Sequence, residues 1–384
     1  MKTLFGLFAF LTCCAATAQV DNTKELQDAI NKGGTINIAR DSFFVKDLYI
    51  PSNTKLVGLN KPYIKAHSIT FYKANNSSIE GFDIEGYTAM DQSTTLVMVL
   101  NCNTIQIVDC TVRDNFAEGI ALNGSKNCKI ANNKIFNTDV GVLLNGGNRD
   151  FDIIANEIRG GTSDGIADWG YSADSTDDFI TINDNKIYNK KANGILTRYS
   201  RFAKIIGNYI EGCYIGITAD DNKGGSRFST IAFNTIVNSG EYGIAGSFDY
   251  SSISKNTISG SVYGMRIGSF QRLQKTLHTR ISDNTIENVQ VGIMLTDVDS
   301  CVLSSNTVIE GKSKKVYASL ILNQGNNNVL SENTVDAGLY KILIQRDVNT
   351  LKSANGTILF NNTGAVEDQG TNTKEAIFIP FIKK

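Results

Sequence analysis

The sequence predicts an all-β protein, a parallel β-helix solenoid of about a dozen coils with a short capping helix at its N-terminal end. Two repeated elements carry this prediction. The tripeptide Asn-x-Ile/Val recurs nine times in one phase, and Gly-Ile-x-aliphatic or a close variant precedes most of its copies. Successive asparagines lie 22 to 29 residues apart, which is the length range of one solenoid coil.

The two elements divide each coil into strands. The asparagines of the first element are Asn133, Asn156, Asn185, Asn208, Asn234, Asn256, Asn284, Asn306 and Asn333. The glycines of the second element are Gly119, Gly141, Gly194, Gly216, Gly243, Gly264 and Gly292. Apolar and polar residues alternate over four to six positions, so each period is expected to carry two short strands. Stacked coils then give parallel sheets around a continuous aliphatic core.

The recurring asparagines are predicted to be structural. An Asn at the same turn position of every coil can stack amide on amide and satisfy its hydrogen bonds inside the turn. We therefore do not expect these side chains to form a ligand-binding row.

This pattern resembles the right-handed parallel β-helix proteins of the pectate-lyase-like group, over roughly residues 61–363. The resemblance implies a right-handed solenoid and a carbohydrate-active protein. Residues 19–60 fit the N-terminal cap of such proteins, with Asn22 as the cap of a short helix and Glu25 three positions on. Residues 364–384 are expected to close the other end, because Ala376 to Ile382 is apolar.

The first 18 residues read as a signal peptide. Lys2 is followed by the apolar run Leu4 to Leu11 and then by Ala16-Thr17-Ala18, the charged, apolar and small-residue order of such peptides. The run is far shorter than the roughly 20 residues that a membrane-spanning helix needs. We expect a secreted or periplasmic protein without a membrane span.

Charge and cysteine content exclude several classes of partner. Lys and Arg total 37 against 38 Asp and Glu, so no overall positive field would hold a nucleic acid. The two histidines are far apart in sequence, which makes a zinc site improbable. Five cysteines follow the signal peptide in surroundings rich in Ile, Val and Ala, and are predicted to be buried free thiols: Cys102, Cys110, Cys128, Cys213 and Cys301.

Three long coils carry extra residues at the same point, after the first strand, in residues 168–178, 220–227 and 268–278. Irregular insertions on one face of a solenoid usually form its site, and these should line up along one sheet edge. The substrate-binding candidates there are Trp169, Tyr171, Asp168, Arg266 and Tyr250.

Two of these candidates have a distinct chemistry. Trp169 is the single tryptophan, and a flat exposed ring is suited to stacking against a sugar, although it could instead pack its own loop onto the solenoid. Arg266 is the only charge in an outward column that reads Ala121, Leu143, Ala167, Leu196, Thr218, Ala245, Arg266 and Met294. It could bind a carboxylate or sulfate in a bidentate contact, or form an ion pair with Asp249 or Asp297.

The first functional hypothesis is a polysaccharide lyase acting on a uronic-acid polymer. β-Elimination needs a neutralised C6 carboxylate, a base for the C5 proton and an acid for the departing O4. Arg198, Lys223 and Arg266 are candidate neutralisers, Lys223 or Tyr199 the base, and Tyr250 or Tyr171 the acid. The resemblance also implies a calcium ion as neutraliser, with Asp168, Asp220 and Asp221 as its oxygen ligands.

Three alternatives stay open at this stage. A glycoside hydrolase could use Asp168 with the Asp220-Asp221 pair, which we expect two coils and about 9.6 Å apart. In polygalacturonase-like hydrolases the aspartate pair precedes the strand and a histidine motif follows one coil later. Here the pair follows Gly216-Ile217, and no histidine lies in 240–246, so the sequence departs from that pattern. Asp220-Asp221 could also be a solvated turn. The other two are a C5-epimerase and a non-catalytic polysaccharide-binding protein; the sequence leaves the oligomeric state open.

Overall fold

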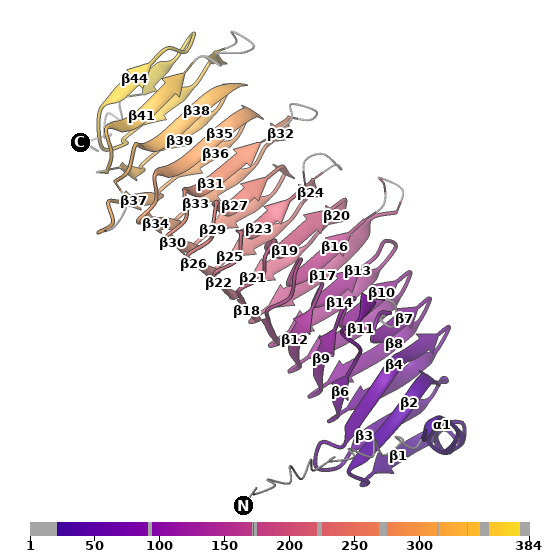
Figure 1. Ribbon diagram of the computed structural model, residues 1–384. Coiled ribbons are helices and arrows are strands. Elements are labelled where there is room, and N and C mark those ends of the chain that lie inside the picture. Colours follow the sequence, from indigo (N-terminus) through magenta and orange to yellow (C-terminus); the bar gives the residue numbers. More distant parts are fainter. Residues whose placement is uncertain are drawn as a thin grey trace, which may run out of the picture.

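The computed structural model describes residues 21–90, 94–170, 172, 175–220, 225–268, 275–312, 315–335, 337–345 and 353–376. In this part of the chain the fold is a right-handed parallel β-solenoid of about 13 turns, with one short helix at the N-terminal end (Figure 1). The predicted fold class is therefore confirmed. Residues 1–18, the predicted signal peptide, lie outside the described residues, so that assignment stays a prediction.

Each regular coil contains three strand positions. The first position holds β2 Ser42–Tyr49, β4 Tyr63–Tyr72, β7 Val97–Leu100, β10 Ile120–Asn123, β13 Val142–Leu144, β16 Ile166–Trp169, β19 Asn193–Arg198, β23 Ile215–Ala219, β27 Tyr242–Gly246, β31 Tyr263–Gly268, β35 Val291–Asp299, β38 Ala318–Asn326, β41 Tyr340–Gln345 and β44 Val366–Asp368. We call the sheet surface formed by these strands the first sheet.

The second position forms a separate hydrogen-bonded sheet. It holds β1 Gly34–Ile38, β3 Thr54–Gly58, β5 Asn75–Glu80, β8 Asn103–Val108, β11 Lys126–Ala131, β14 Arg149–Ile154, β17 Asp177–Asn183, β20 Ser200–Arg201, β21 Lys204–Ile206, β24 Ser226–Arg227, β25 Thr230–Ala232, β28 Phe248–Asp249, β29 Ser252–Ser254, β33 Arg280–Ser282, β36 Val302–Ser304, β39 Val329–Ser331, β43 Ile358–Phe360 and β45 Lys374–Ala376.

The third position contains the Asn-x-Ile/Val element. It holds β6 Asp83–Glu85, β9 Thr111–Asn115, β12 Lys134–Thr138, β15 Glu157–Arg159, β18 Lys186–Tyr188, β22 Tyr209–Glu211, β26 Thr235–Val237, β30 Thr257–Ser259, β34 Thr285–Glu287, β37 Thr307–Ile309 and β40 Thr334–Val335; β32 Thr276–Leu277 and β42 Ala354–Asn355 pair with the ends of β35 and β38.

The expectation of two strands per coil is wrong, and the reason is the shortness of one turn. Only residues 184 and 185 separate β17 from β18, with Asp184 in the left-handed region at φ 55°. The apolar alternation therefore continues across this turn, and two strands read as one in the sequence.

The core is a set of aliphatic columns inside the solenoid. Ile166, Ile195, Ile217 and Ile244 are in register on consecutive strands of the first sheet and are completely buried. One continuous cluster of buried side chains extends from Leu26 in the helix to Leu359 in β43. The five cysteines are buried and free, as predicted.

The asparagine prediction is confirmed in detail. The Asn234 Oδ1 atom accepts hydrogen bonds from the backbone N–H and the side-chain Nδ2 of Asn208, at 3.0 and 2.9 Å. The Nδ2 of Asn234 donates to the Ile205 carbonyl and to Asn256 Oδ1. The same bonds repeat from Asn133 to Asn362, so the ladder satisfies its own polar atoms.

Helix α1, Thr23–Ile30, covers the N-terminal end of the core with Leu26 and Ile30 (Figure 1). Asn22 stands at the predicted cap position, but its side chain does not bond the helix backbone. It donates instead to Glu25 Oε2 at 3.3 Å. At the other end β44 and β45 continue the register of β41 and β43 by one further coil.

No helix among the described residues is long and apolar enough to cross a membrane.

Candidate functional site

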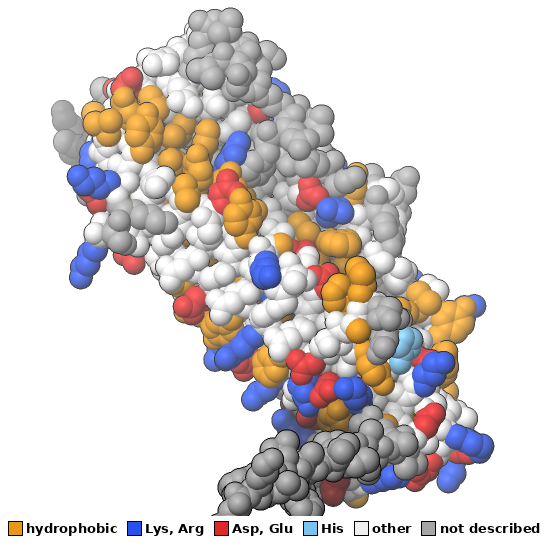
Figure 2. Space-filling model, in the orientation of Figure 1, with side chains coloured by type: hydrophobic (Ala, Val, Ile, Leu, Met, Phe, Trp, Pro, Cys, Tyr) orange, Lys and Arg blue, Asp and Glu red, His pale blue; other side chains and the backbone are white. Residues whose placement is uncertain are grey.

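The outward column predicted from the sequence is present on the first sheet. The strand register aligns Ala121, Leu143, Ala167, Leu196, Thr218, Ala245, Arg266 and Met294. Their side chains alternate with the buried core residues, so they belong to the outer face of this sheet. Figure 2 shows apolar side chains gathered over the C-terminal coils of the solenoid.

Three predicted site residues are in direct contact on this outer face. Trp169 is in register with Arg198, whose guanidinium lies 5.5 Å from the centroid of the Trp169 ring. Arg198 donates from Nε and Nη2 to Asp220 Oδ2, at 3.0 and 2.7 Å. We call Trp169, Arg198 and Asp220 the edge triplet. Its arginine is therefore already paired with a carboxylate.

The tryptophan of the edge triplet is partly buried. Its ring packs against the outer apolar residues Ala121, Val140, Leu143 and Ala167. The ring therefore contributes to packing, whereas its stacking against a sugar stays a prediction. This arrangement differs from a freely exposed platform.

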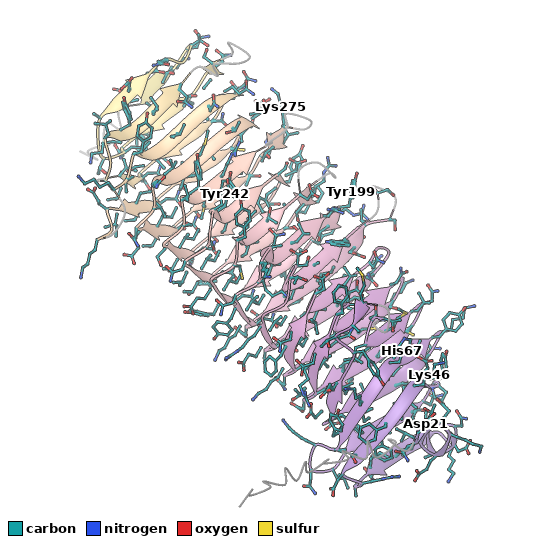
Figure 3. The ribbon with its side chains drawn as sticks, in the orientation of Figure 1. Asp21, Lys46, His67, Tyr199, Tyr242 and Lys275 are labelled. Atoms are coloured by element: carbon teal, nitrogen blue, oxygen red, sulfur yellow. The ribbon has the colours of Figure 1, made fainter. Side chains whose placement is uncertain are left out.

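Arg266 lies on the same face, three strands beyond Arg198 in the order β19, β23, β27 and β31. Its Nη1 donates to the Tyr242 hydroxyl at 3.0 Å. The Tyr242 ring centroid is 5.2 Å from that of Tyr263 in the next coil. Figure 3 shows Tyr242 in the middle of the solenoid, whereas Tyr199 lies at the edge that carries the insertions.

Tyr242 is not among the site residues predicted from the sequence, although a signal was available. Tyr242-Gly243 and Tyr263-Gly264 place a tyrosine directly before the glycine of two consecutive Gly-Ile elements, so the register stacks the rings beside Arg266. Burial, assisted by the Glu241 carboxylate, raises the pKa of Tyr242 to about 12. Its hydroxyl is therefore protonated at neutral pH and can donate a proton. The Tyr214 hydroxyl donates to the same Glu241.

Asp168 is not on the outer face, which corrects its prediction as a substrate and calcium ligand. It is completely buried and in register with the interior residues Leu144 and Thr197. Strand β16 continues through Trp169, so alternation turns Asp168 inward when Trp169 points outward. Asp168 and Asp220 thus lie on opposite sides of one sheet. They cannot hold the same ion or flank one glycosidic bond.

The two predicted proton-transfer tyrosines lie apart. Tyr199 forms the corner between β19 and β20 with φ 51°, and its Cβ lies against Gly170. Tyr250 belongs to an exposed row on the far side of that corner, in which neighbouring ring centroids are 4.8 to 5.4 Å apart. We call this row the aromatic stack; its members are Phe179, Phe202, Phe228, Tyr250 and His278.

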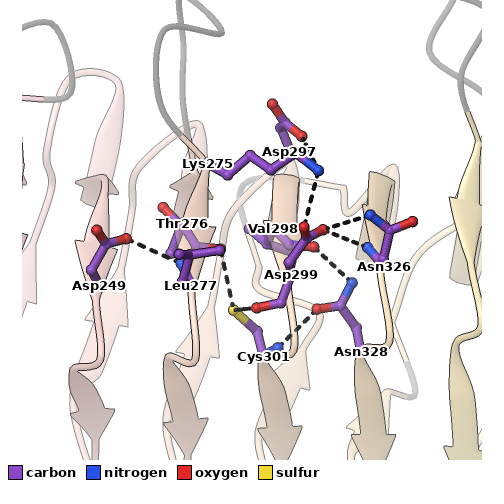
Figure 4. A network of polar contacts seen from close by, with 10 residues as sticks. All are labelled: Asp249, Lys275, Thr276, Leu277, Asp297, Val298, Asp299, Cys301, Asn326 and Asn328. Carbon is purple, nitrogen blue, oxygen red and sulfur yellow. Dashed lines mark hydrogen bonds and ion pairs between the residues drawn. The ribbon is translucent and has the colours of Figure 1, made fainter.

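Lys223, Asp221 and Tyr171 lie outside the described residues, so their roles stay predictions. The third insertion ends at Lys275, whose Nζ is 2.9 Å from Asp299 Oδ2 and 3.8 Å from Asp297 (Figure 4). Asp299 in turn accepts from the backbone and side chain of Asn326. The cationic end of this insertion is thus tied to the next two coils.

Residues 46–239 match the family described as periplasmic copper-binding protein (NosD). The chain belongs to this family. No curated protein sequence matches the chain.

Several solved structures share the fold at low sequence identity. The catalytic unit of a GH87 α-1,3-glucanase from Streptomyces thermodiastaticus is 18% identical, with a TM-score of 0.65 over 93% of this chain and 68% of that one. An exopolygalacturonase from Thermotoga maritima is 14% identical, with a TM-score of 0.54 over 73% and 86%. The adhesin PfbA of Streptococcus pneumoniae is 16% identical, with a TM-score of 0.54 over 93% and 97%.

The described residues do not fit a copper site. Copper is bound mainly by histidine nitrogen and by cysteine or methionine sulfur. His67 Nδ1 is hydrogen-bonded to Asp47 Oδ1, 2.8 Å away in the N-terminal coils, whereas His278 stacks on Tyr250. Within the described ranges no three His, Cys, Asp or Glu side chains come together to hold a metal ion.

Proposed function

We propose that this chain is an exported protein that binds an acidic polysaccharide along the outer face of the first sheet and cleaves it by β-elimination. One observation carries the proposal. The edge triplet and Arg266 occupy the same outer face, and the edge triplet lies two residues further along the strands than the column of Arg266, so cationic and aromatic groups extend along the solenoid axis in two adjacent columns. The glucanase and exopolygalacturonase among the similar structures support a carbohydrate-directed role for this fold, and the periplasmic family supports export.

The spacing of the cations suits a polymer that lies parallel to the solenoid axis. Neighbouring strands are about 4.8 Å apart, so Arg198 and Arg266 are separated by about 14 Å along the axis, across three strand intervals. They are also offset by about 7 Å along the strands, because Leu196 and not Arg198 is in register with Arg266. A uronic-acid chain carries a carboxylate on every sugar, and guanidinium groups bind carboxylates well. Different sugars of one chain would thus contact the two arginines.

The elimination step places demands on individual residues. The guanidinium of Arg198 or Arg266 would neutralise the C6 carboxylate, while Tyr199 or Lys223 would remove the C5 proton. Tyr242 is the acid best placed beside Arg266, because its hydroxyl lies 3.0 Å from the Arg266 guanidinium. Tyr250 and Tyr171 remain the acids proposed from the sequence. A calcium ion held by Asp220 and Asp221 would be an alternative neutraliser.

The test is to incubate the mature protein, with and without calcium, with alginate, pectate and glycosaminoglycans, and to follow unsaturated-uronate absorbance together with reducing ends. We expect absorbance to rise with at least one polymer. Arg266→Ala should lower the rate at least tenfold, which corresponds to about 1.4 kcal/mol of transition-state stabilisation. Arg280→Ala, on the second sheet, is the matched control and should keep the wild-type rate. Reducing ends without absorbance would contradict elimination and indicate hydrolysis.

A second candidate is non-catalytic binding of the same polymers. It is favoured by the ion pair between Arg198 and Asp220, which leaves the arginine charge already compensated. Affinity electrophoresis in gels that contain each polymer measures binding independently of cleavage. Retardation without any product would support this candidate. Exchange of the C5 proton with solvent, without cleavage, would instead indicate a C5-epimerase.

A further inference from the structure

Two aspartates point into the solenoid directly beneath the edge triplet. Asp168 is the penultimate residue of β16, and Asp177 is the first residue of β17. Both side chains are completely buried. Asp168 is in register with Thr197, and Asp177 with Ser200, so both face the same following coil. A buried carboxyl pair therefore joins the end of one strand to the start of the next.

Most polar atoms of this pocket have no partner. Asp177 Oδ1 accepts the backbone N–H of Asn148 at 2.6 Å. The other oxygen of Asp177, both oxygens of Asp168 and the Ser200 hydroxyl make no hydrogen bond among the described residues. Buried polar groups nearly always have a hydrogen-bond partner. Four unpartnered oxygen atoms in one buried place therefore indicate a proton or an ion bound between them.

The charged groups around the pocket do not compensate two carboxylates. Asp178 follows Asp177 but points outward and pairs with Arg201. Arg198, beside Thr197, is bound to Asp220 on the outer face, and Arg149, in the preceding coil, lies near Asp150. Leu144 and Asn148 complete the surroundings from the preceding coil. Burial and the neighbouring Asp177 carboxylate both raise the pKa of Asp168 well above its ordinary range.

We propose that Asp168 and Asp177 share one proton, which holds the end of β16 against the start of β17 and thereby positions Trp169 on the outer face. Two ionised carboxylates side by side in an apolar interior would repel each other without compensation. A single proton leaves one negative charge, which the Asn148 N–H stabilises. Both aspartates are thus positioning residues. This inference does not depend on the substrate or on the proposed reaction.

The single tryptophan makes the arrangement directly measurable. Trp169 adjoins Asp168, and its ring contacts Ala167 on the sheet and Arg198 across the coil. Loss of the proton would push β16 and β17 apart and expose the ring. In the full mature chain we expect Trp169 emission to shift to longer wavelength, and quenching by acrylamide to increase, as the pH is raised from about 4 to about 9.

Two variants and one control distinguish the effect of the shared proton on Trp169 from a general effect of substitution on the fold. Asp168→Asn keeps a hydrogen-bond donor toward Asp177 without a titrating group, so the pH-dependent shift should be lost and emission should stay at the low-pH position. Asp177→Asn removes the repulsion and should move the transition to lower pH. Asp150→Asn, an exposed residue with φ 58° that suits asparagine, should reproduce the wild-type curve. Far-UV circular dichroism confirms that each variant is folded.

Several results would overturn the proposal. These are wild-type emission that does not change with pH, or an Asp168→Asn variant that titrates like the wild type. If Asp168→Asn does not fold, the proposal is overturned when the Trp169 emission of Asp177→Asn changes at the same pH as that of the wild type. The scan is repeated with calcium chloride and with EDTA. Identical curves are expected, whereas a shift that depends on calcium would replace the shared proton with a bound cation.

Discussion

At the residue scale, the most unusual side chain outside the site is a buried lysine. Lys190 is 1% exposed, and its Nζ donates to the carbonyl oxygens of Thr138 and Asp139 at 3.0 and 2.9 Å. Space for the ammonium exists because Gly161 has no side chain; a Cβ there would lie 2.7 Å from Nζ. Lys190 thus bonds carbonyls two coils away, at the cost of burying a charge.

We predict that this lysine makes stability depend on pH. Burial lowers the pKa of Lys190 from 10.5 to about 8, so the folded state loses the proton before the unfolded state does. The burial penalty is therefore complete below about pH 8 and disappears as the pH rises toward 10.5. Relative to Lys190→Met, the wild-type free energy of unfolding should increase over this window by up to about 3 kcal/mol.

Urea unfolding at several pH values measures this difference. Comparing the two proteins removes the contribution of the other groups that titrate at alkaline pH. Lys191→Met changes an exposed neighbour and should follow the wild-type curve. Parallel curves for wild type and Lys190→Met would show that the ammonium is not buried in solution.

At the element scale, the asparagine ladder couples successive turns. Each internal member accepts two hydrogen bonds and donates two, in a site that is closed to water. Removing one side chain leaves several buried groups unsatisfied on the preceding coil, and each such group costs about 1 to 3 kcal/mol.

We predict that Asn234→Ala lowers the free energy of unfolding by about 3 kcal/mol or more. The substitution orphans the Asn208 N–H, the Asn208 amide and the Ile205 carbonyl, all on the preceding coil, and removes one of the donors to Asn256 Oδ1 on the following coil. Thr235→Ala, one residue on and facing outward, should cost less than about 1 kcal/mol. Equal losses in the two variants, measured by urea denaturation, would contradict a special role for the ladder.

The aromatic stack is a second feature at this scale. It combines backbone strain at positive φ with attraction between stacked rings. Phe179, Phe202, Phe228 and Tyr250 have φ between 52° and 59°, a region that bulky residues rarely adopt. Their rings are 39% to 47% exposed, so burial does not explain them. Ring stacking contributes about 0.5 to 1.5 kcal/mol per pair, which offsets the backbone cost of about 1 kcal/mol or more per residue.

We predict that two substitutions of Phe202 separate the contribution of ring stacking from the cost of the strained backbone. Phe202 stacks on both Phe179 and Phe228. Phe202→Ala loses both stacks and keeps the strained backbone, so it should destabilise the protein by about 2 kcal/mol. Phe202→Asn also loses the stacks, but asparagine tolerates positive φ and should cost about 1 kcal/mol less than alanine. Thermal unfolding of both variants checks this order, and a stability of Phe202→Ala equal to wild type would refute it.

At the scale of the whole molecule, a single core runs the length of the solenoid and must be closed at its ends. Helix α1 closes the N-terminal end with Leu26 and Ile30, which are 1% and 0% exposed. An uncovered coil would present both apolar surface and unpaired strand edges, which promote association. The cap is therefore expected to affect the solubility of the protein more than the arrangement of residues on the outer face.

We predict that the double variant Leu26→Asp with Ile30→Asp associates through its N-terminal end. Size-exclusion chromatography with light scattering should show a larger species than the wild type at the same concentration. The control, Lys24→Ala with Asp28→Ala, removes an exposed ion pair from the same helix and should elute as wild type. If the double Asp variant also elutes as wild type, α1 does not protect the core.

The sequence by itself determined the solenoid, the outward column and the asparagine ladder. Each of these follows from a repeat, because a residue type that recurs at one position of every coil has one environment. The placement of Trp169, Arg198 and Asp220 along one sheet edge was predicted in the same way, because they leave their strands at equivalent points, whereas their mutual contacts were not predicted. The repeats therefore allowed the fold and part of the candidate site to be predicted from the sequence.

Only the tertiary structure decided the inward position of Asp168, the third strand of each coil and the partnership of Arg266 with Tyr242. Side chains alternate along a strand, so one residue more in β16 moves Asp168 from the surface to the core. Tyr242 reaches Arg266 through the register between two coils. Where a strand ends, and which strands pair, depends on packing across the coil, and no local pattern in the chain specifies it.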